Sequence, residues 1–251
     1  MLKEELIKVL SQRFLFVFED AKTYIYVRKE GIQDKERLGG GNFTIAYSLF
    51  ALLNLASKVH YYLHKSQKFV DAELQNQVKD LKDKILANKL TTEEKKLIRN
   101  QMVIPRLMET NELNAFVEFA RELEAEGLKL REEHGSSHDD YSTIWSGFRN
   151  MLAHLATVQD GKGVMAYTLE KHWPNEITKS TPLDNVLEII KEDNSRFPPF
   201  FYVTTRRGWI MNVDALVALV PDIRDVTIKC IDESEMTDQE LSQLLEFIQP
   251  S

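Results

Sequence analysis

Residues 43–63 read FTIAYSLFALLNLASKVHYYL, and this stretch is apolar almost all the way round a helix. A helix without a polar face belongs where neighbouring elements cover every side of it. Asn42 directly before it is a credible N-cap, and Gly39, Gly40 and Gly41 let the chain turn sharply into the helix. The stretch therefore predicts the central helix of a bundle.

Other segments in the first two thirds of the chain carry apolar residues at helical spacing. They are 1–36, 70–88, 91–105 and 113–134. The β-favouring residues 24–27 leave the end of the first helix open, a capping box of Thr91 with Glu94 begins the third, and Gly127 weakens the fourth. Residues 136–142 read as a polar loop, and a last helix follows as far as residues 160–163. Together these patterns predict an α-helical bundle over residues 1–163.

After Gly163 the pattern changes to short β-favouring stretches. Strands are expected at 164–169, 200–204, 209–213 and 226–231, with a hairpin loop at 206–208 and helices at 181–190 and 237–247. Thr181-Pro182 would begin the first of these helices, and a capping box of Thr237 with Glu240 would begin the second. The expected fold class is therefore mainly α: a helical bundle followed by a small α+β region over residues 164–251, either separate from the bundle or packed on it.

The charge of the chain is unevenly divided. Of the 251 residues, 39 are acidic and 32 basic, a net charge of −7. Residues 164–251 hold 15 acidic and 8 basic residues, which leaves 24 of each sign in residues 1–163. The first part is therefore neutral and the second acidic. Neither has the broad basic surface of a protein that grips nucleic acid through many phosphates, although a small local basic site remains compatible with this balance.

Membrane association is not expected. The longest apolar run, 46–56, is too short to cross a bilayer, and the first residues of the chain do not follow the layout of a signal peptide. Cys230 is the single cysteine and cannot form an internal disulfide, which fits a reducing compartment. We therefore expect a cytoplasmic location.

Residues 149–154 concentrate more chemistry than any other stretch, in the pattern R-N-x-x-x-H. On a helix, Asn150 and His154 share a face beside an apolar stripe that contains Ile144 and Phe148, and Arg149 lies on the other flank of that stripe. RNA cleavage without a metal needs a base for the 2′-hydroxyl proton and a cation for the charge that grows on the phosphate. Histidine suits the first task and arginine the second, while Asn150 could orient the site. A surface histidine beside a salt-bridged arginine is the alternative.

A helical bundle with R-N-x-x-x-H near the start of its last helix resembles the HEPN superfamily. The resemblance implies a metal-independent endoribonuclease that acts on single-stranded RNA in a defence or toxin–antitoxin setting. It assigns Arg149 and His154 as the catalytic pair and Asn150 as the polar residue beside the arginine, in a site composed across a homodimer interface. It covers the bundle and not residues 164–251. The Gly39–Asn42 sequence is also similar to that of a group of uncharacterised bacterial helical proteins.

Two other hypotheses come from different classes of protein. The first is a non-catalytic helical interaction protein whose acidic C-terminal region binds a basic protein partner. The second is a nucleotide or small-anion binder at Gly39, Gly40, Gly41 and Asn42, because free N–H groups at a helix start attract anions. The Lys-Ser/Thr pair of a P-loop is missing there, so a tight turn into the helix explains these glycines better.

Several further residues have the chemistry of a site, but a structural role explains them better. His60 and His64 have metal-ligand spacing, yet no glutamate follows His60, and ordinary buried or boundary histidines account for them. Cys230 reads as a small core residue of a strand with no local histidine to activate it. The remaining candidates are a loop cluster for a divalent ion or a helix cap (His134, His138, Asp139, Asp140) and a hairpin tip for a nucleotide (Arg206, Arg207, beside Tyr202 and Trp209). We therefore expect no metal or cofactor.

Overall fold

The computed structural model describes residues 2–31, 42–65, 84, 91, 112–133, 137–154, 173–203 and 208–249. Its elements are α1 (Leu2–Glu30), α2 (Asn42–Lys65), α6 (Glu112–Ala125), α7 (Ser137–His154), α8 (Leu183–Asp193), β1 (Phe200–Val203), β2 (Gly208–Met211), α9 (Val213–Glu233) and α10 (Asp238–Ile248). The described chain is mainly helical with a small two-stranded sheet, which confirms the expected fold class. The helices expected over 70–88 and 91–105 and the strand expected over 164–169 lie outside the described residues, apart from single positions.

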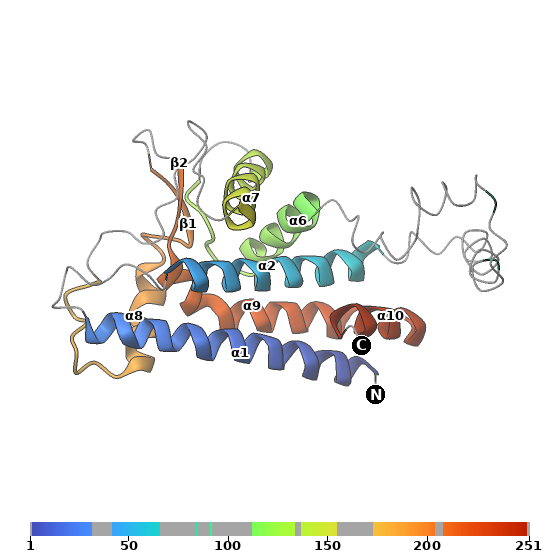
Figure 1. Cartoon of the computed structure of the whole chain (residues 1–251), viewed down its shortest axis with the longest axis horizontal. Helices are drawn as coiled ribbons and strands as arrows, with labels where there is room; N and C mark the ends of the chain where they lie inside the picture. The colour runs from blue at the N-terminus through green and yellow to red at the C-terminus, as the bar shows by residue number, and fades with distance from the viewer. Residues whose placement is uncertain are drawn as a thin grey trace.

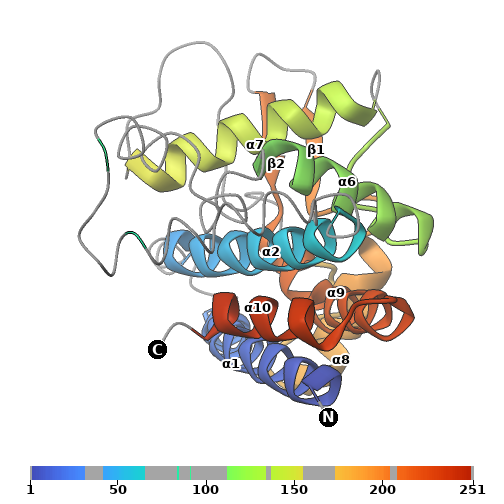
Figure 2. The same cartoon turned by 90° about the vertical axis from the view of Figure 1, so that its right-hand side faces the viewer.

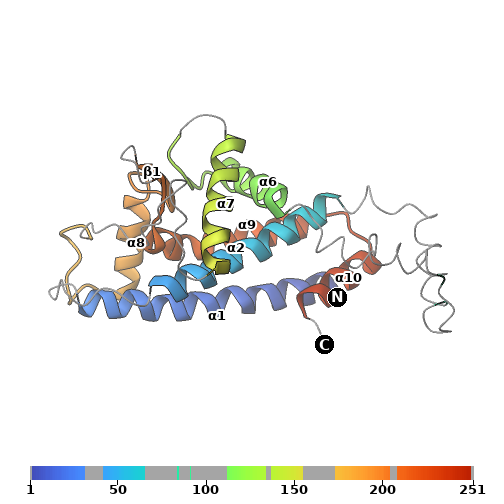
Figure 3. The same ribbon diagram turned by 45° about the horizontal axis from the view of Figure 1, so that its top comes forward.

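The long helices lie in layers. Figure 1 shows the axes of α1, α9 and α2 roughly aligned, with α1 antiparallel to the other two and with α6 and α7 on the far side of α2 from α1. Figure 2 shows the same layers from one end, with α1 and α10 on one side, α2 in the middle and α7 on the other side. In Figure 3, α7 crosses over α2 at a steep angle. None of the described helices has a stretch both long and apolar enough to span a membrane.

The nearly all-apolar helix α2 lies between the other layers, where it packs against α1, α6 and α9. Its buried residues cover about half of the helix circumference: Ala46, Leu49, Phe50, Leu52, Leu53, Ala56, Ser57, Val59, His60 and Leu63. The other half carries the exposed Tyr47 and Ala51, so the expectation that neighbours cover every side of this helix is wrong. The buried Ser57 hydroxyl donates to the Leu53 carbonyl at 2.6 Å, so this polar group costs little inside the core. The helix begins at Asn42 itself, one residue earlier than expected.

Helix α9 occupies the place of an expected strand. The β-favouring residues 226–231 predicted a strand, but they form the second half of this helix. Val226, Thr227 and Ile231 are buried while Asp225 and Lys229 are exposed, which is helical rather than alternating spacing. Burial of this face against α1 and α2 stabilises the helix, and this stabilisation overrides the weak β-propensity of valine and isoleucine. The Thr227 hydroxyl donates to the Ile223 carbonyl at 2.7 Å, so the helix also satisfies this side chain.

The predicted hairpin is present. Strands β1 and β2 pair antiparallel, with Phe201 opposite Ile210 and Val203 opposite Gly208. The second strand ends at Met211, two residues earlier than expected, because Asn212 caps α9 by accepting a hydrogen bond from the Ala215 N–H at 3.2 Å. Phe200 anchors the hairpin to the rest of the fold, since its N–H donates to the Leu130 carbonyl at 2.7 Å.

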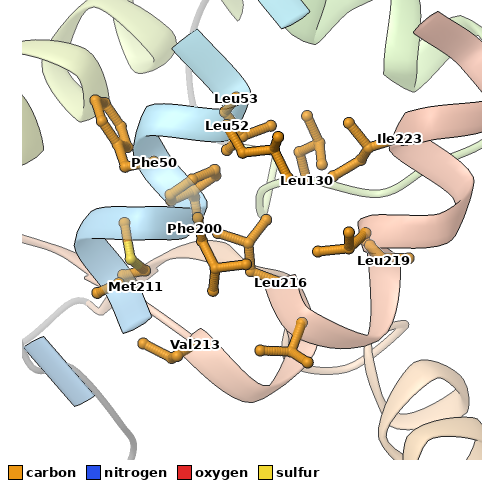
Figure 4. Packing of buried hydrophobic residues seen from close by; sticks show 14 of the residues in the cluster. Phe50, Leu52, Leu53, Leu130, Phe200, Met211, Val213, Leu216, Leu219 and Ile223 are labelled. Carbon is orange, nitrogen blue, oxygen red and sulfur yellow. The ribbon is translucent and has the colours of Figure 1, made fainter. Parts of the chain in front are cut away.

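One buried cluster contains residues from both sides of Gly163. Phe116 and Phe148 from the first part of the chain share it with Phe200, Met211 and residues of α9. Figure 4 shows Phe50, Leu52 and Leu53 of α2 gathered with Leu216, Leu219 and Ile223 of α9 and with Phe200 of the hairpin. Helix α9 therefore contributes to the same core as the preceding helices.

Helix α6 is shorter than expected. It ends at Ala125 rather than near His134-Gly135, and Gly127 has a φ of 85°. The Leu128 N–H donates to the Leu123 carbonyl and the Gly127 N–H donates to the Glu124 carbonyl, each at 3.0 Å. These two bonds form a Schellman motif, so the glycine that was expected only to weaken the helix terminates it.

Other boundaries differ from the expectations by smaller amounts. Residues 137–142, expected as a loop, form the start of α7, and residues 24–27 are a continuous part of α1. Helix α8 begins at Leu183 and ends at Asp193, and the Thr181 hydroxyl accepts from the Thr178 N–H instead of capping the helix. The capping box of Thr237 with Glu240 is confirmed, and α10 ends at Ile248.

Candidate functional site

The R-N-x-x-x-H residues lie on the last two turns of α7, and their backbone is helical from Arg149 to His154. The predicted apolar stripe is confirmed upstream, where Ile144 and Phe148 are buried. Position 150 shares a helix face with Ser146, which is exposed. The side chains of Arg149, Asn150 and His154 lie outside the described residues, so the structure positions the helix that carries them and not their polar groups.

The inner face of α7 is held by aromatic packing. Trp145 lies 5.0 Å from Phe116 of α6 and 5.2 Å from Phe50 of α2, measured between ring centroids. The Phe148 ring lies 5.5 Å from Phe200 of the hairpin. Because these large buried rings come from three other elements, they fix how far α7 can rotate about its own axis. The same contacts therefore set the position of the helix backbone that carries residues 149–154.

The start of α7 is held by a buried ion pair. Arg131 Nη1 lies 2.9 Å from Asp140 Oδ2, and the two side chains are 8% and 9% exposed. The Tyr141 hydroxyl donates to Glu124 Oε1 at 2.7 Å, and the Arg131 guanidinium lies 5.3 Å from the centre of the Tyr141 ring. Burial, together with the Glu124 carboxylate, raises the pKa of Tyr141 well above its usual value. Asp140 was expected in a loop or as a helix cap. Instead it lies within α7 and pairs with Arg131 inside the fold.

The other predicted sites fall largely outside the described residues. These are Gly39, Gly40, Gly41, His134, Arg206 and Arg207, together with the side chains of Asn42, His138, Asp139 and Tyr202. The anion-binding and divalent-ion hypotheses for these residues remain predictions.

A buried cluster of charged residues joins the C-terminal end of α1 to the start of α9. Arg28 donates to Asp214 in the first turn of α9, and the Trp173 indole N–H donates to the same carboxylate oxygen at 2.8 Å. The Arg28 guanidinium also lies 5.1 Å from the Trp173 ring. The pKa of Tyr24, which accepts a hydrogen bond from Arg28, is raised by burial and by the Asp214 charge. These contacts satisfy charges that would otherwise be costly to bury, so we assign this group to the fold.

The structure also brings Cys230 beside His60 and His64, a grouping that the sequence did not indicate. His60 and His64 of α2 lie beside Cys230 of α9, and one ligand atom from each residue lies within 4.8 Å of the other two. The cysteine thus has two histidines near it and lies on a helix, in contrast to the expected strand position without a histidine. The four-residue spacing of the histidines was visible in the sequence, but their approach to a distant cysteine depends on the packing of α2 against α9.

Burial shifts the pKa values of two members of this cluster, His60 and Cys230. Desolvation, followed by the nearby His64, lowers the pKa of His60 to about 4. Burial raises the pKa of Cys230 to about 11, with further contributions from Glu122, Glu233 and Glu126. The imidazole of His60 is therefore neutral at pH 7, and the thiol keeps its proton unless a cation replaces it.

Comparisons of the chain with protein-family models, with curated proteins and with solved structures find no match.

Proposed function

We propose that the chain is a HEPN-like, metal-independent endoribonuclease that cleaves single-stranded RNA as a homodimer in a cytoplasmic defence or toxin–antitoxin setting. The observation that carries the proposal is the R-N-x-x-x-H pattern on α7, in a helical fold that packs the apolar stripe between the flanks of the motif into its core. Arg149 would hold the scissile phosphate, His154 would transfer the proton and Asn150 would orient the site.

Helix geometry supports a site shared between two copies of the chain. Arg149 and His154 are five positions apart, which turns them about 140° around α7 and displaces them about 7.5 Å along it. One straight helix therefore directs the two positions to different sides. A twofold axis beside α7 would bring Arg149 of one protomer towards His154 of its partner, because both copies present the same surface.

The reaction needs only groups that this motif supplies. An imidazole takes the proton of the 2′-hydroxyl, and the 2′-oxygen attacks the neighbouring phosphorus. The bond from phosphorus to the 5′-oxygen then breaks, and an imidazolium returns a proton to that leaving oxygen. The products are a 2′,3′-cyclic phosphate and a 5′-hydroxyl end. The guanidinium steadies the charge on the phosphate oxygens through two N–H donors.

The first experiment incubates the purified chain with unstructured RNA in the presence of EDTA. His154→Ala and Arg149→Ala should each lower the cleavage rate about 100-fold or more, since general acid–base catalysis by His154 and charge stabilisation by Arg149 each contribute at least about that much. Ser146→Ala, an exposed substitution on the same helix, is the matched control and should keep the wild-type rate. Cleavage that persists in both variants, or that needs added metal for the chemical step, would refute the mechanism.

A mixing experiment tests the shared site. In a mixed dimer of Arg149→Ala and His154→Ala chains, a site built across the interface regains one intact Arg149–His154 pair, so activity should return to about half of the wild-type value or less. A site contained within one chain would stay inactive, because each protomer lacks one partner. Dimer formation alone does not decide this point. Helix α1 carries exposed Leu15, Phe16 and Val27 but lies across the bundle from α7 (Figure 2), so pairing through α1 would not join the motifs.

A further inference from the structure

The cluster of His60, His64 and Cys230 has the geometry of a metal site. Its three ligand atoms lie within 4.8 Å of one another, and the two imidazole rings are 4.3 Å apart between centroids. Ligand atoms on a tetrahedral zinc ion are about 3.5 Å apart, given bond lengths of about 2.0–2.3 Å. Shifts of roughly 1 Å in side-chain position would therefore close the cluster round one ion. His64 is exposed, which leaves a route for the ion to enter.

A second observation points to a ligand at the same place. His60 is only 5% exposed, and neither of its ring nitrogens has a hydrogen-bond partner. Neutral imidazole carries one N–H donor and one lone pair, and burying such groups without partners is costly. The ring is held against Phe119 of α6 at 5.5 Å, so it sits between the core and the other two members of the cluster. A cation would give the lone pair of His60 a partner.

The surrounding charges favour a cation. Glu122 of α6, Glu126 directly after α6 and Glu233 at the end of α9 act on Cys230, and Lys229 opposes them. The same carboxylates that disfavour a bare thiolate attract a divalent ion to it.

We propose that His60, His64 and Cys230 together bind one thiophilic divalent cation of the zinc class. One thiolate and two imidazoles select zinc or cobalt over the harder magnesium and calcium, which prefer oxygen ligands. On binding, the thiol releases its proton and the sulfur forms a bond to the metal, while water fills the fourth position. The ion would join the last turns of α2 to α9. This site is separate from the R-N-x-x-x-H motif and does not depend on the proposed ribonuclease activity.

The test uses the untagged full chain, freed of metal and titrated with Zn²⁺ against a chromogenic chelator and, separately, with Co²⁺. We expect one ion per chain and, with cobalt, the charge-transfer absorption that a thiolate ligand produces. Cys230→Ser and His64→Ala should each weaken Zn²⁺ binding by about 100-fold or more, because loss of a direct ligand should cost at least as much as loss of its supporting contacts. Tyr47→Ala, another exposed substitution on α2, should bind as the wild type does.

His64→Ala keeps the experiment interpretable, because this exposed side chain can be removed without a cavity in the core. Circular dichroism and thermal unfolding of each metal-free variant show whether it is folded before titration. Binding that is equal in wild type, Cys230→Ser and His64→Ala would overturn the proposal, and so would a cobalt complex without the thiolate band. Equal affinity for Mg²⁺ would also overturn it. Each of these results leaves the test of Arg149 and His154 unaffected.

Discussion

Replacing Asp140 by alanine breaks the buried ion pair that holds the start of α7, and its effect can be worked from the contacts. The substitution leaves Arg131, 8% exposed, without the carboxylate at 2.9 Å. Removing one partner of a buried pair typically costs about 3–5 kcal/mol, because the remaining charge stays buried and uncompensated. Arg131 keeps the Glu132 carbonyl at 3.1 Å and Glu124 at 3.5 Å. We therefore expect the lower end, about 3 kcal/mol.

Urea unfolding at pH 7, followed by circular dichroism, measures this cost. With a slope of about 3 kcal/mol per molar urea, the midpoint should fall by about 1 M. Asp225→Ala is the matched control. The Asp225 side chain lies 2.7 Å from Arg224, and it is 63% exposed. Exposed pairs of this kind contribute about 0–1 kcal/mol, so the midpoint should move little.

A double substitution separates burial of charge from loss of packing. Arg131→Met combined with Asp140→Leu removes both charges while keeping apolar volume, and it should cost less than Asp140→Ala alone. Equal midpoints for Asp140→Ala and Asp225→Ala would refute the reasoning. A double variant less stable than the single one by the full cost of Arg131→Met would do the same, since the two charges would then act independently.

Three further perturbations have separate causes. Phe116→Ala should cost about 3–5 kcal/mol in urea unfolding, because this buried ring packs against Trp145 and Phe50 and its loss leaves a cavity. Gly127→Ala should cost about 1 kcal/mol through the backbone alone, since its φ is 85° and an added Cβ would meet nothing within 4 Å; a stabilising effect would contradict the Schellman geometry. Tyr62 has its pKa raised to about 12 by burial and by Glu240, so the folded chain keeps a proton that the unfolded chain releases near pH 10. Stability should therefore fall as pH rises from about 10 to 12, and Tyr62→Phe should reduce that fall in pH-dependent unfolding measurements.

The elements that were predictable carried their signal within a few neighbouring residues. Helix α2 is apolar through most of its length, and in the fold it packs against α1, α6 and α9, although its side with Tyr47 and Ala51 is exposed. The box of Thr237 with Glu240 closes its own hydrogen bonds at 2.8 Å and 3.4 Å, so it needs no distant partner. The hairpin depends on two strands that are close in sequence.

The elements that were not predictable depend on distant contacts. Residues 226–231 are rich in β-branched side chains, and Pro221 within the same helix argues locally against a continuous α9. Only the packing of this segment against α1 and α2 stabilises the helical conformation over a strand. The sequence favoured Gly135 over Gly127 as the helix end. In the fold the helix ends at Ala125, and the Leu130 carbonyl beyond it accepts a hydrogen bond from the Phe200 N–H, a distant contact that the sequence did not indicate.

The candidate sites differ in the same way. The R-N-x-x-x-H pattern is local, so the sequence could identify its residues and the helix that carries them. The geometry of a site shared between two chains, as proposed, would lie beyond any local pattern. The His60–His64–Cys230 cluster is the opposite case. Its residues come from helices far apart in the sequence, so the sequence showed only a histidine pair and an isolated cysteine. The unpartnered ring of His60 becomes visible only after folding.

The two proposals interact in one practical respect. A metal bound by Cys230 would stabilise the fold by about 2.7 kcal/mol when its free concentration is 100 times its dissociation constant. EDTA would then lower the fraction of folded chain near the unfolding temperature, and cleavage would depend on metal although no metal takes part in the chemistry.

His64→Ala resolves this ambiguity, because it removes the exposed ligand and leaves α7 untouched. If this variant cleaves RNA equally well with and without EDTA at a temperature where it is folded, the metal acts on stability. Loss of cleavage in folded, metal-free wild type would instead mean that the ion belongs to the reaction, and the metal-independent mechanism would be wrong.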